Sequence, residues 1–457
     1  MERHLGHALA TAMLAGAWTP ADMAGRCAAA VHRAAPAPWM TALCAEVVDV
    51  FSDPPRDTPR LLRDLILVLP AWQASRPARA NDRSSAAKRR PGTGLQTAVD
   101  RARPVYWAPS ATEMGPARWP VTPLATAADL AALLDVDTAE LAWFADVRSQ
   151  ERRTTSTLRH YTVVARPKPS GVRVLEVPKP RLREIQRRLL RHVLAPIPLH
   201  TSAHGSVAHR SVATAVAPHA GNGVVLRADI ESFFASINAG RVYGVLRSAG
   251  YPEPVAHLLT GLTTTVLALG EWRAIPGSGE AHRRLGRVLA RPHLPQGAPT
   301  SAALANLVTF CLDRRLAGLA ESFGARYTRY VDDLVFSGPT LRARRLLAAV
   351  TDVVADEGFL LAQRKSVVLS RAGRQQVLGA VINDKVGVAR SDLDRLRATL
   401  HNCVQTGWQA QARNLTAAQF RAQLSGRIAW VNSLDPLRGA QLRHQFDAIR
   451  WPAELTD

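Results

Sequence analysis

Two adjacent aspartates, Asp332 and Asp333, stand between two runs typical of β-strands, residues 326–331 and 334–336. Asp229 directly follows a third such run, residues 224–228. Adjacent carboxylates at a tight hairpin repel each other and raise each other's pKa unless a cation neutralises them. A bare Asp-Asp turn taken alone is best interpreted as a polar hairpin tip. A divalent metal bound to the three carboxylates would relieve their repulsion, and the motifs that flank them favour this second interpretation.

Such a site has a definite chemistry. Two metal ions about 3.5 to 4 Å apart, bridged by carboxylates, can activate a hydroxyl group and stabilise a departing pyrophosphate. Mg²⁺ suits this task because it prefers oxygen ligands and keeps waters and substrate phosphates in its shell. We expect two Mg²⁺ ions, with Mn²⁺ as the alternative.

The charge balance favours a partner rich in phosphate. Among 457 residues, 58 are Lys or Arg and 37 are Asp or Glu, which gives a net charge of +21. That excess is typical of proteins that lie along nucleic acid, although membrane-surface proteins share it. No run reaches the roughly 18 apolar residues that a membrane-spanning helix needs. For that reason we expect no membrane partner. The four cysteines show neither zinc nor disulfide spacing, which fits a reducing compartment, so we expect a cytoplasmic protein.

Changes in composition divide the chain into four parts. Residues 1–73 form a helical N-terminal extension, 74–119 a basic flexible linker, 120–385 a mixed region with α+β character, and 386–457 a second helical region. Helix starts are predicted at four Ser or Thr residues, each taken as the N-cap. These are Thr126 with Asp129, Thr138, Ser391 with Asp394, and Thr416 with Gln419.

The start of the mixed region predicts a β-hairpin over 161–177, with its turn at 169–171. Lys168 and Arg173 lie on either side of that turn. Exposed cations beside a turn are ordinarily solvated, so a binding function for them needs further support. An amphipathic helix is predicted next, over 181–194.

The motif Tyr330-Val331-Asp332-Asp333 resembles the Tyr-x-Asp-Asp box of reverse transcriptases. Residues 227–237 resemble that family's first catalytic-aspartate motif, and residues 294–301 resemble its template- and nucleotide-binding loop, with Asn306 in the helix that follows. The likeness spans 161–379 and keeps the family's order. It implies a right-hand polymerase, with fingers and palm in 120–385 and a helical thumb in 386–457.

Within that family, the chain most resembles bacterial retron-type enzymes, through Ala203-His204-Gly205 followed by Arg210-Ser211. Three positions differ from the retron pattern. Residues 215–219 keep only the histidine of Asn-Ala-x-x-His, Leu378 replaces Thr in Val-Thr-Gly, and Val331 replaces the commoner Ala. His204, His209 and His219 match no zinc spacing, so we expect them to make local hydrogen bonds or to contact phosphate, and we assign them no metal.

The resemblance assigns roles at the catalytic motifs. It implies that Asp229 and Asp332 hold both metals, that Asp333 assists, and that the backbone carbonyl of Ile230 completes one shell. Phe234 matches the ring that excludes a 2′-hydroxyl and so selects deoxynucleotides. Its neighbour Phe233 is better interpreted as a core aromatic.

Further nucleotide contacts follow from the same likeness. Lys168 and Arg173 resemble the residues that clamp a triphosphate, with simple solvation the open alternative for Lys168. Gln296 and Gly297 position the nucleotide, Gly297 by allowing close backbone approach. Lys365 resembles the lysine that protonates the leaving pyrophosphate, and the alternative is a surface lysine that begins a strand.

The retron resemblance implies particular partners. These are a structured non-coding RNA that is both template and primer, its cDNA product, deoxynucleoside triphosphates, and an effector protein in phage defence. Two alternatives stay open. One is another bacterial reverse transcriptase, such as a group II intron protein or a different defence polymerase; the other is a non-catalytic RNA-binding protein. Primer extension with and without magnesium separates the second alternative from an enzyme.

Overall fold

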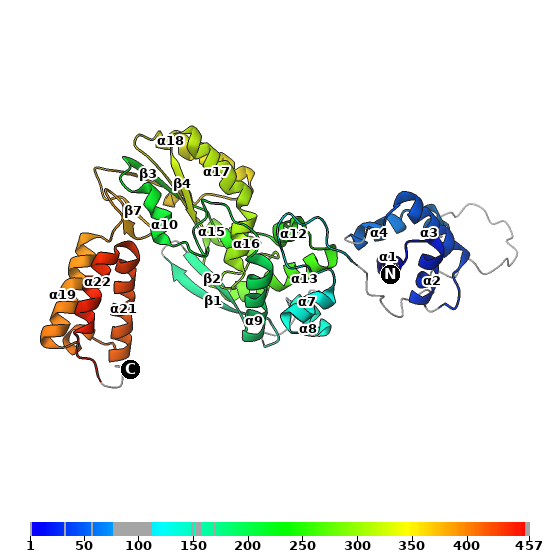
Figure 1. Ribbon diagram of the computed structural model, residues 1–457, viewed down its shortest axis with the longest axis horizontal. Coiled ribbons are helices and arrows are strands. Elements are labelled where there is room, and N and C mark those ends of the chain that lie inside the picture. Colours follow the sequence, from blue (N-terminus) through cyan, green and yellow to red (C-terminus); the bar gives the residue numbers. More distant parts are fainter. Residues whose placement is uncertain are drawn as a thin grey trace. The chain divides into compact units, whose positions relative to one another are not determined.

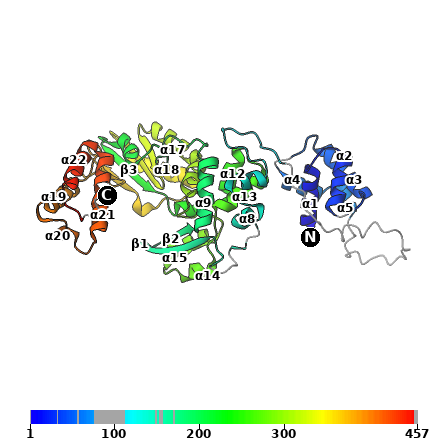
Figure 2. The ribbon, with the colours of Figure 1, turned by 60° about the horizontal axis from the view of Figure 1, so that its bottom comes forward.

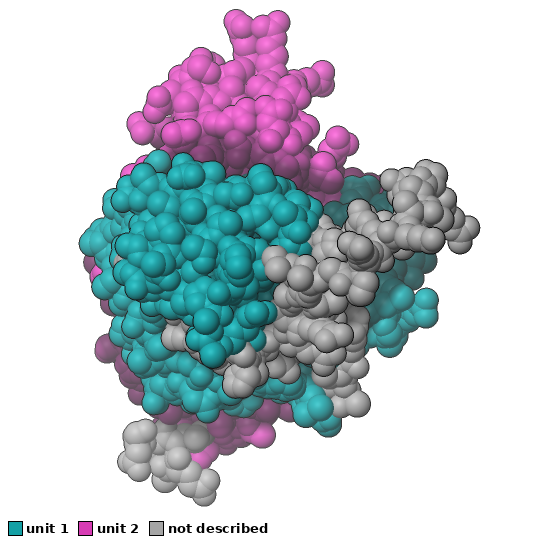
Figure 3. Space-filling view, turned by 90° about the vertical axis from the view of Figure 1, so that its right-hand side faces the viewer, with its two compact units in different colours: residues 1–198, 238–301 teal, residues 199–237, 302–457 magenta. Residues whose placement is uncertain are grey.

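The computed structural model describes residues 2–31, 33–55, 58–75, 112–147, 150–151, 157–168 and 171–452. The chain divides into two compact units, coloured separately in Figure 3. Unit 1 comprises Met1–Pro198 and Asn238–Ser301, and unit 2 comprises Leu199–Ile237 and Ala302–Asp457. Most of the predicted linker over 74–119 lies outside the described residues.

Unit 1 begins with a helical bundle, drawn in blue in Figure 1. Four of its helices start with proline at their first position, where the missing N–H costs no hydrogen bond. Trp39 and Trp72 meet edge to face in its core, with ring centroids 6.1 Å apart. The helices are α1 (Glu2–Leu14), α2 (Pro20–Ala30), α3 (Pro38–Val50), α4 (Pro59–Ile66) and α5 (Pro70–Ala74).

The rest of unit 1 combines short helices with one hairpin, and the predicted hairpin is confirmed. Figure 2 shows its strands, β1 and β2, as an extended ribbon. Val172, Val174 and Glu176 alternate inward along the second strand. The elements are α7 (Ala127–Leu134), α8 (Thr138–Phe144), β1 (Tyr161–Lys168), β2 (Gly171–Pro178), α9 (Pro180–Leu189), the π-helical turn η2 (Leu190–Leu194), α12 (Ala239–Ser248), α13 (Glu253–Thr263), α14 (Leu269–Ala274) and α15 (Gly279–Leu289).

Helix starts in this part test the capping predictions. Thr126 and Asp129 exchange side-chain-to-backbone hydrogen bonds, which confirms the predicted capping box. The predicted cap at Thr138 is wrong by one residue. Asp137 caps α8 instead, because its carboxylate accepts the Glu140 N–H at 2.7 Å while Thr138 is already helical.

Unit 2 is built on a four-stranded antiparallel sheet in the order β4-β5-β3-β6, as the α+β prediction requires. Helix α17 packs against β4 and α18, and α18 also contacts β3. The elements are α10 (Val212–Val216), the 3-10 turn η3 (Ala217–His219), β3 (Val224–Asp229), α11 (Phe233–Ser236), α16 (Ser301–Val308), α17 (Phe310–Ser322), β4 (Arg326–Tyr330), β5 (Asp333–Gly338), α18 (Ala343–Asp356), the 3-10 turn η4 (Gln363–Lys365) and β6 (Val367–Ser370).

A small hairpin follows the sheet, formed by β7 (Gln376–Val377) and β8 (Ala380–Val381). Both turn residues have positive φ, 50° at Leu378 and 84° at Gly379. A turn with two positive φ angles normally favours Asn-Gly, so Leu378 is unusual there. Its side chain packs against an apolar cluster that also contains Val377 and Trp430, and this packing accounts for an apolar residue at the turn.

The end of unit 2 is helical, in orange and red in Figure 1. Thr416 and Gln419 form the predicted capping box. The predicted cap at Ser391 is wrong, because the helix already includes Arg390 and Asp394 lies 3.8 Å from that arginine. The helices are α19 (Arg390–Thr406), α20 (Gln409–Ala412), α21 (Ala417–Leu434) and α22 (Pro436–Asp447). Among the described helices of both units, none has the length and apolar character needed to cross a membrane.

His219 joins two strands of the sheet from inside the core. Its Nδ1 lies 2.7 Å from the Ser337 hydroxyl and its Nε2 lies 2.8 Å from the Thr328 hydroxyl. Thr328 donates its own proton to the Ala215 carbonyl, so Nε2 is the donor and Nδ1 the acceptor of a neutral imidazole. Burial lowers the pKa of His219 to about 3. The residue therefore works as an uncharged cross-link.

Acid should weaken this cross-link. The unfolded chain binds a proton on His219 near pH 6.5, whereas the folded chain resists it down to about 3, so stability falls as pH drops through that window. We expect His219 to steepen the loss by up to about 1.4 kcal/mol per pH unit. Urea unfolding from pH 7 to 4 should show a shallower dependence for His219→Gln. The exposed His444→Gln should match the unmodified protein, and equal slopes for all three would contradict the prediction.

Candidate active site

The sheet brings the three predicted aspartates of unit 2 to one place. Asp229 ends β3 directly opposite Asp333, which begins β5. Asp332 occupies the turn between β4 and β5, and its carbonyl accepts the Ile230 N–H at 3.0 Å. Val331 precedes it with φ of +58°, a left-handed conformation that is strained for a β-branched residue. A strained hairpin therefore holds two carboxylates beside the third.

The electrostatics show that these carboxylates repel one another. Burial, followed by the charges of Asp229 and Asp333, raises the pKa of Asp332 to about 6. Burial also raises the pKa of Asp333, with Asp229 adding to the effect and Arg227 opposing it. The Arg227 guanidinium lies 3.6 Å from Asp333. Added positive charge would stabilise the ionised form of this group.

Lys365 supplies one such charge. Its Nζ donates to both carboxylate oxygens of Asp229, at 2.8 and 2.9 Å. The lysine lies in the turn η4 and its side chain is half exposed. Within the described ranges, no three His, Cys, Asp or Glu side chains are arranged as a ready metal cluster. The carboxylate donors nevertheless have the hard-oxygen chemistry that Mg²⁺ takes, and Lys365 neutralises Asp229 in this arrangement.

Two phenylalanines lie just after the first aspartate. Phe233 is buried and packs on Phe359, with ring centroids 6.0 Å apart, which confirms its interpretation as a core aromatic. Phe234 is half-buried and its ring centroid lies 5.5 Å from that of Phe233. Core packing thus fixes the ring of Phe233, and the ring of Phe234 packs beside it.

The hairpin of unit 1 carries a cationic face. Lys168 and Arg173 are both exposed, and Arg166 stands directly opposite Arg173 in the register. Like charges directly opposed on a sheet are destabilising, and none of the three cations has an ion pair with a described residue. Sequence reasoning missed Arg166. The signal was present, because residues 166 and 168 point to the same face of a strand.

A buried glutamate–histidine hydrogen bond anchors the predicted nucleotide-binding loop of unit 1. His293 Nε2 lies 2.8 Å from Glu176, and both side chains are almost wholly buried. Burial lowers the pKa of His293, but the charge and hydrogen bond of Glu176 outweigh it, so the pKa is raised. The Glu176 N–H donates to the Gln296 carbonyl at 2.9 Å. Sequence reasoning missed this pair, because its partners are 117 residues apart.

Gly297 follows Gln296 in that loop. Two features of the backbone favour glycine at this position. Its φ is +131°, and a Cβ placed on it would lie 3.1 Å from the Glu176 carbonyl. In this structure the backbone at Gly297 lies close to that of strand β2. Gln296 itself is half-buried.

Two of the three histidines singled out in the sequence make side-chain hydrogen bonds. His204 Nδ1 lies 2.9 Å from the Thr214 hydroxyl, and burial lowers the pKa of His204 to about 4. His219 makes the two bonds described above. His209 has a left-handed backbone, with φ of +59°.

The predicted site residues therefore fall into two groups. Unit 2 holds the carboxylates with Ile230, Phe234 and Lys365, and unit 1 holds the cationic hairpin with Gln296 and Gly297. The first group can bind hard cations and the second can bind phosphate. Phosphoryl transfer uses both kinds of side chain.

Sequence comparisons match this chain to reverse transcriptases. A family model described as reverse transcriptase (RNA-dependent DNA polymerase) matches residues 165–382. The retron Mx65 reverse transcriptase of Myxococcus xanthus is 40% identical over 320 residues, covering 69% of this chain and 70% of that protein. The retron Mx162 reverse transcriptase of the same organism is 33% identical over 377 residues, covering 78% and 74%. A solved foamy viral protease-reverse transcriptase aligns with a TM-score of 0.35 at 16% identity, covering 66% of this chain and 42% of that one.

Proposed function

The chain belongs to the retron-type reverse transcriptases, and we propose that it extends a primer on RNA using two divalent ions held by Asp229, Asp332 and Asp333. It is an RNA-directed DNA polymerase of right-hand fold. One observation carries the metal proposal. Three mutually repelling carboxylates converge where β3 meets the β4–β5 turn, and two of them have raised pKa values. Nearby positive charge would relieve that repulsion.

The roles proposed within this group rest on the family resemblance and on the charges of the side chains. Asp229 and Asp332 would hold both ions, Asp333 would assist, and the Ile230 carbonyl would complete one shell. When bound, Mg²⁺, or Mn²⁺ in its place, activates the primer hydroxyl and stabilises the leaving pyrophosphate. Lys365 exchanges its contact with Asp229 for the substrate and donates a proton to pyrophosphate. Its half-exposed side chain supports that mobility.

The nucleotide contacts form the second part of the proposal. Arg173, Lys168 and the newly identified Arg166 bind the triphosphate, which would relieve the unfavourable pairing of like charges on the hairpin. Gln296 and Gly297 position the nucleotide on a loop fixed by the Glu176–His293 pair. Phe234 restricts the sugar to the deoxy form. We further propose that 120–385 comprises fingers and palm and 386–457 the thumb, preceded by the extension 1–73 and the linker 74–119.

The partners form the third part. We propose a structured non-coding RNA as both template and primer, an RNA-linked single-stranded DNA product, and an effector protein that acts with the enzyme in phage defence. The names of the relatives as retron enzymes support the RNA assignment. The cytoplasm, which supplies deoxynucleotides, is the proposed compartment. The free cysteines of the described chain are compatible with it.

Removing one carboxylate should abolish polymerisation. Asp332→Asn keeps the shape of the side chain but loses its charge, so Mg²⁺-dependent primer extension should fall by more than about 100-fold, beyond the usual cost of losing an indirect metal contact. Asp229→Asn should behave alike. Asp352→Asn, an exposed change on α18, is the matched control. Extension by Asp332→Asn at the unmodified rate would refute the metal proposal.

Truncating Phe234 should relax sugar selection. Phe234→Ala removes the ring that would meet a 2′-hydroxyl, so the ratio of kcat/KM for dNTP over rNTP should fall by at least about tenfold. Steady-state incorporation of a single nucleotide measures this ratio. Phe310→Ala, which removes a partly exposed ring on α17, should leave it unchanged. The same ratio in Phe234→Ala and the unmodified protein would count against the role of Phe234.

The retron assignment predicts a specific nucleic acid in the purified protein. Sequencing of copurified material should give one RNA joined covalently to DNA copied from the same locus. The Asp332→Asn protein should carry that RNA without DNA. Heterogeneous cellular RNA with no DNA from the active protein would overturn the RNA partner while leaving polymerase activity to be judged by primer extension.

A further inference from the structure

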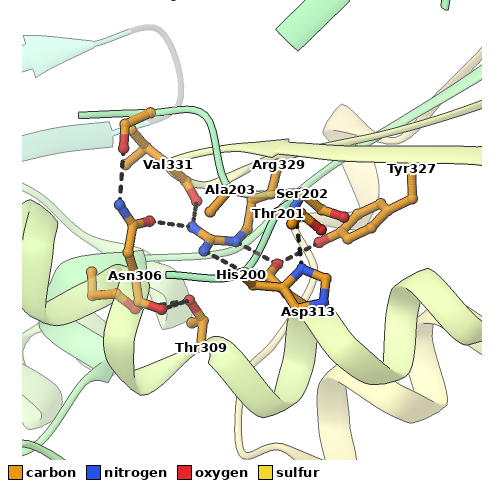
Figure 4. A network of polar contacts seen from close by, with 12 residues as sticks. His200, Thr201, Ser202, Ala203, Asn306, Thr309, Asp313, Tyr327, Arg329 and Val331 are labelled. Carbon is orange, nitrogen blue, oxygen red and sulfur yellow. Dashed lines mark hydrogen bonds and ion pairs between the residues drawn. The ribbon is translucent and has the colours of Figure 1, made fainter. Parts of the chain in front are cut away.

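We propose that Arg329, Asp313 and Asn306 form a guanidinium clamp that holds the left-handed turn at Val331 and so positions Asp332. The inference deepens the proposed function and rests on it. Asn306 accompanies the motif that resembles the nucleotide-binding loop, but no role was predicted for it or for Arg329 and Asp313. They are positioning residues, because they act on the catalytic carboxylate through the backbone of the turn. Figure 4 shows the side chains of Asn306 and Asp313 around the Arg329 guanidinium, which itself contacts the Val331 carbonyl.

Arg329 is the centre of the clamp and is completely buried. Its Nε and Nη2 donate to the two carboxylate oxygens of Asp313, at 2.8 and 2.6 Å. Its Nη1 donates to the Asn306 side-chain oxygen and to the Val331 carbonyl, both at 3.0 Å. Tyr327 holds Asp313 from the other side with a hydrogen bond of 2.8 Å. The fork is thus fixed in direction at every nitrogen.

Stability alone does not account for this cluster. Desolvating two charges can cost as much as their attraction returns, and apolar residues of similar volume often serve a core equally well. The ion pair with Asp313 instead fixes the direction in which the Arg329 guanidinium points, and so aims its Nη1 at the turn. The Nη1 bond joins Arg329 to a carbonyl two residues later and therefore spans the start of the turn. With φ of +58° at Val331, the backbone needs such a restraint.

Asn306 extends the clamp to the other side of the turn. Its Nδ2 donates to the Gly205 carbonyl at 2.9 Å. A Cβ on Gly205 would lie 2.6 Å from both the Val331 nitrogen and its Cγ2, closer than nonbonded atoms approach. The loop is also tied to β4, because the Arg329 N–H donates to Ser202 and the Arg329 carbonyl accepts from His204. The Ala203-His204-Gly205 motif therefore forms the surface on which the turn rests.

The clamp also reaches the motif of the first aspartate. The Arg329 guanidinium carbon lies 5.9 Å from the centroid of the Phe233 ring. Phe233 adjoins Phe234, the residue proposed to select the sugar. Arg329 thus contacts both the turn that carries Asp332 and the ring that packs beside Phe234.

Two single variants test the clamp directly. Gly205→Ala adds the methyl group that collides with Val331, and Arg329→Lys keeps the charge but cannot make the fork. Titration with Mn²⁺, following free Mn²⁺ by electron paramagnetic resonance, measures the metal site without requiring activity. We expect affinity to fall by about 10- to 100-fold in each. We also expect kcat for primer extension to fall by at least about tenfold, with KM for primer-template unchanged.

Two control variants make the same kinds of substitution, Gly to Ala and Arg to Lys, at sites outside the clamp. Gly318→Ala lies on the same helix as Asp313 and has open space around it, and Arg344→Lys is exposed on α18. Both should retain Mn²⁺ affinity and kcat. Asp332→Asn marks the affinity that remains when the site itself is lost.

A double variant distinguishes positioning from a structural role. Arg329→Met with Asp313→Leu replaces the ion pair by apolar side chains, and thermal unfolding reports whether the fold survives. A folded double variant with reduced Mn²⁺ affinity and kcat supports the clamp. Unchanged affinity and kcat in it would overturn the clamp. If it does not fold, unchanged affinity and kcat in Gly205→Ala would overturn it equally.

Failure of the proposed function gives a different result. Unmodified protein that neither binds Mn²⁺ through Asp332 nor extends a primer refutes the function. Protein that binds Mn²⁺ through Asp332 but does not extend a primer refutes the function alone, because the variants still test the clamp by affinity.

Discussion

The antiparallel pairing of β3 with β5 is the constraint on which the site depends. It sets Asp229 opposite Asp333 and leaves Asp332 in the adjoining turn. Three carboxylates held this close repel one another, and their burial makes the repulsion stronger because little water screens it. The fold must therefore supply both positive charge and a rigid frame, and the neighbouring elements provide each of these.

Two cations near the surface supply positive charge to the carboxylates, and a buried cluster around Arg329 holds the turn in place. Lys365 binds Asp229 and Arg227 approaches Asp333, so each of these carboxylates has a cation nearby. The frame consists of Arg329 and its buried partners, which fix the left-handed turn from inside the unit. The half-exposed Lys365 is placed where substrate and metal could replace it, whereas Arg329 is completely buried. This division suits a site that must exchange ligands without losing its geometry.

Unit 1 also contains a buried polar pair, and there the pair holds a loop rather than a turn. Its buried Glu176–His293 pair ties strand β2 to the loop that contains Gln296 and Gly297. The hairpin beyond it carries opposed cations at Arg166 and Arg173. The proposed binding of phosphate by this hairpin uses exposed positive charge on a rigid support. A buried polar pair provides that support in unit 1, as Arg329 and Asp313 do in unit 2.

The sequence by itself determined the strands, the three aspartates, the hairpin and the family, because these depend on local periodicity and on motifs of adjacent residues. It misplaced the caps at Thr138 and Ser391, since neighbouring residues compete for the same backbone groups. Only the tertiary structure decided that Lys365 meets Asp229 and that Arg329 meets Asp313. Such pairs join residues distant in the chain, or separate elements, and their geometry arises when the sheet and helices pack together.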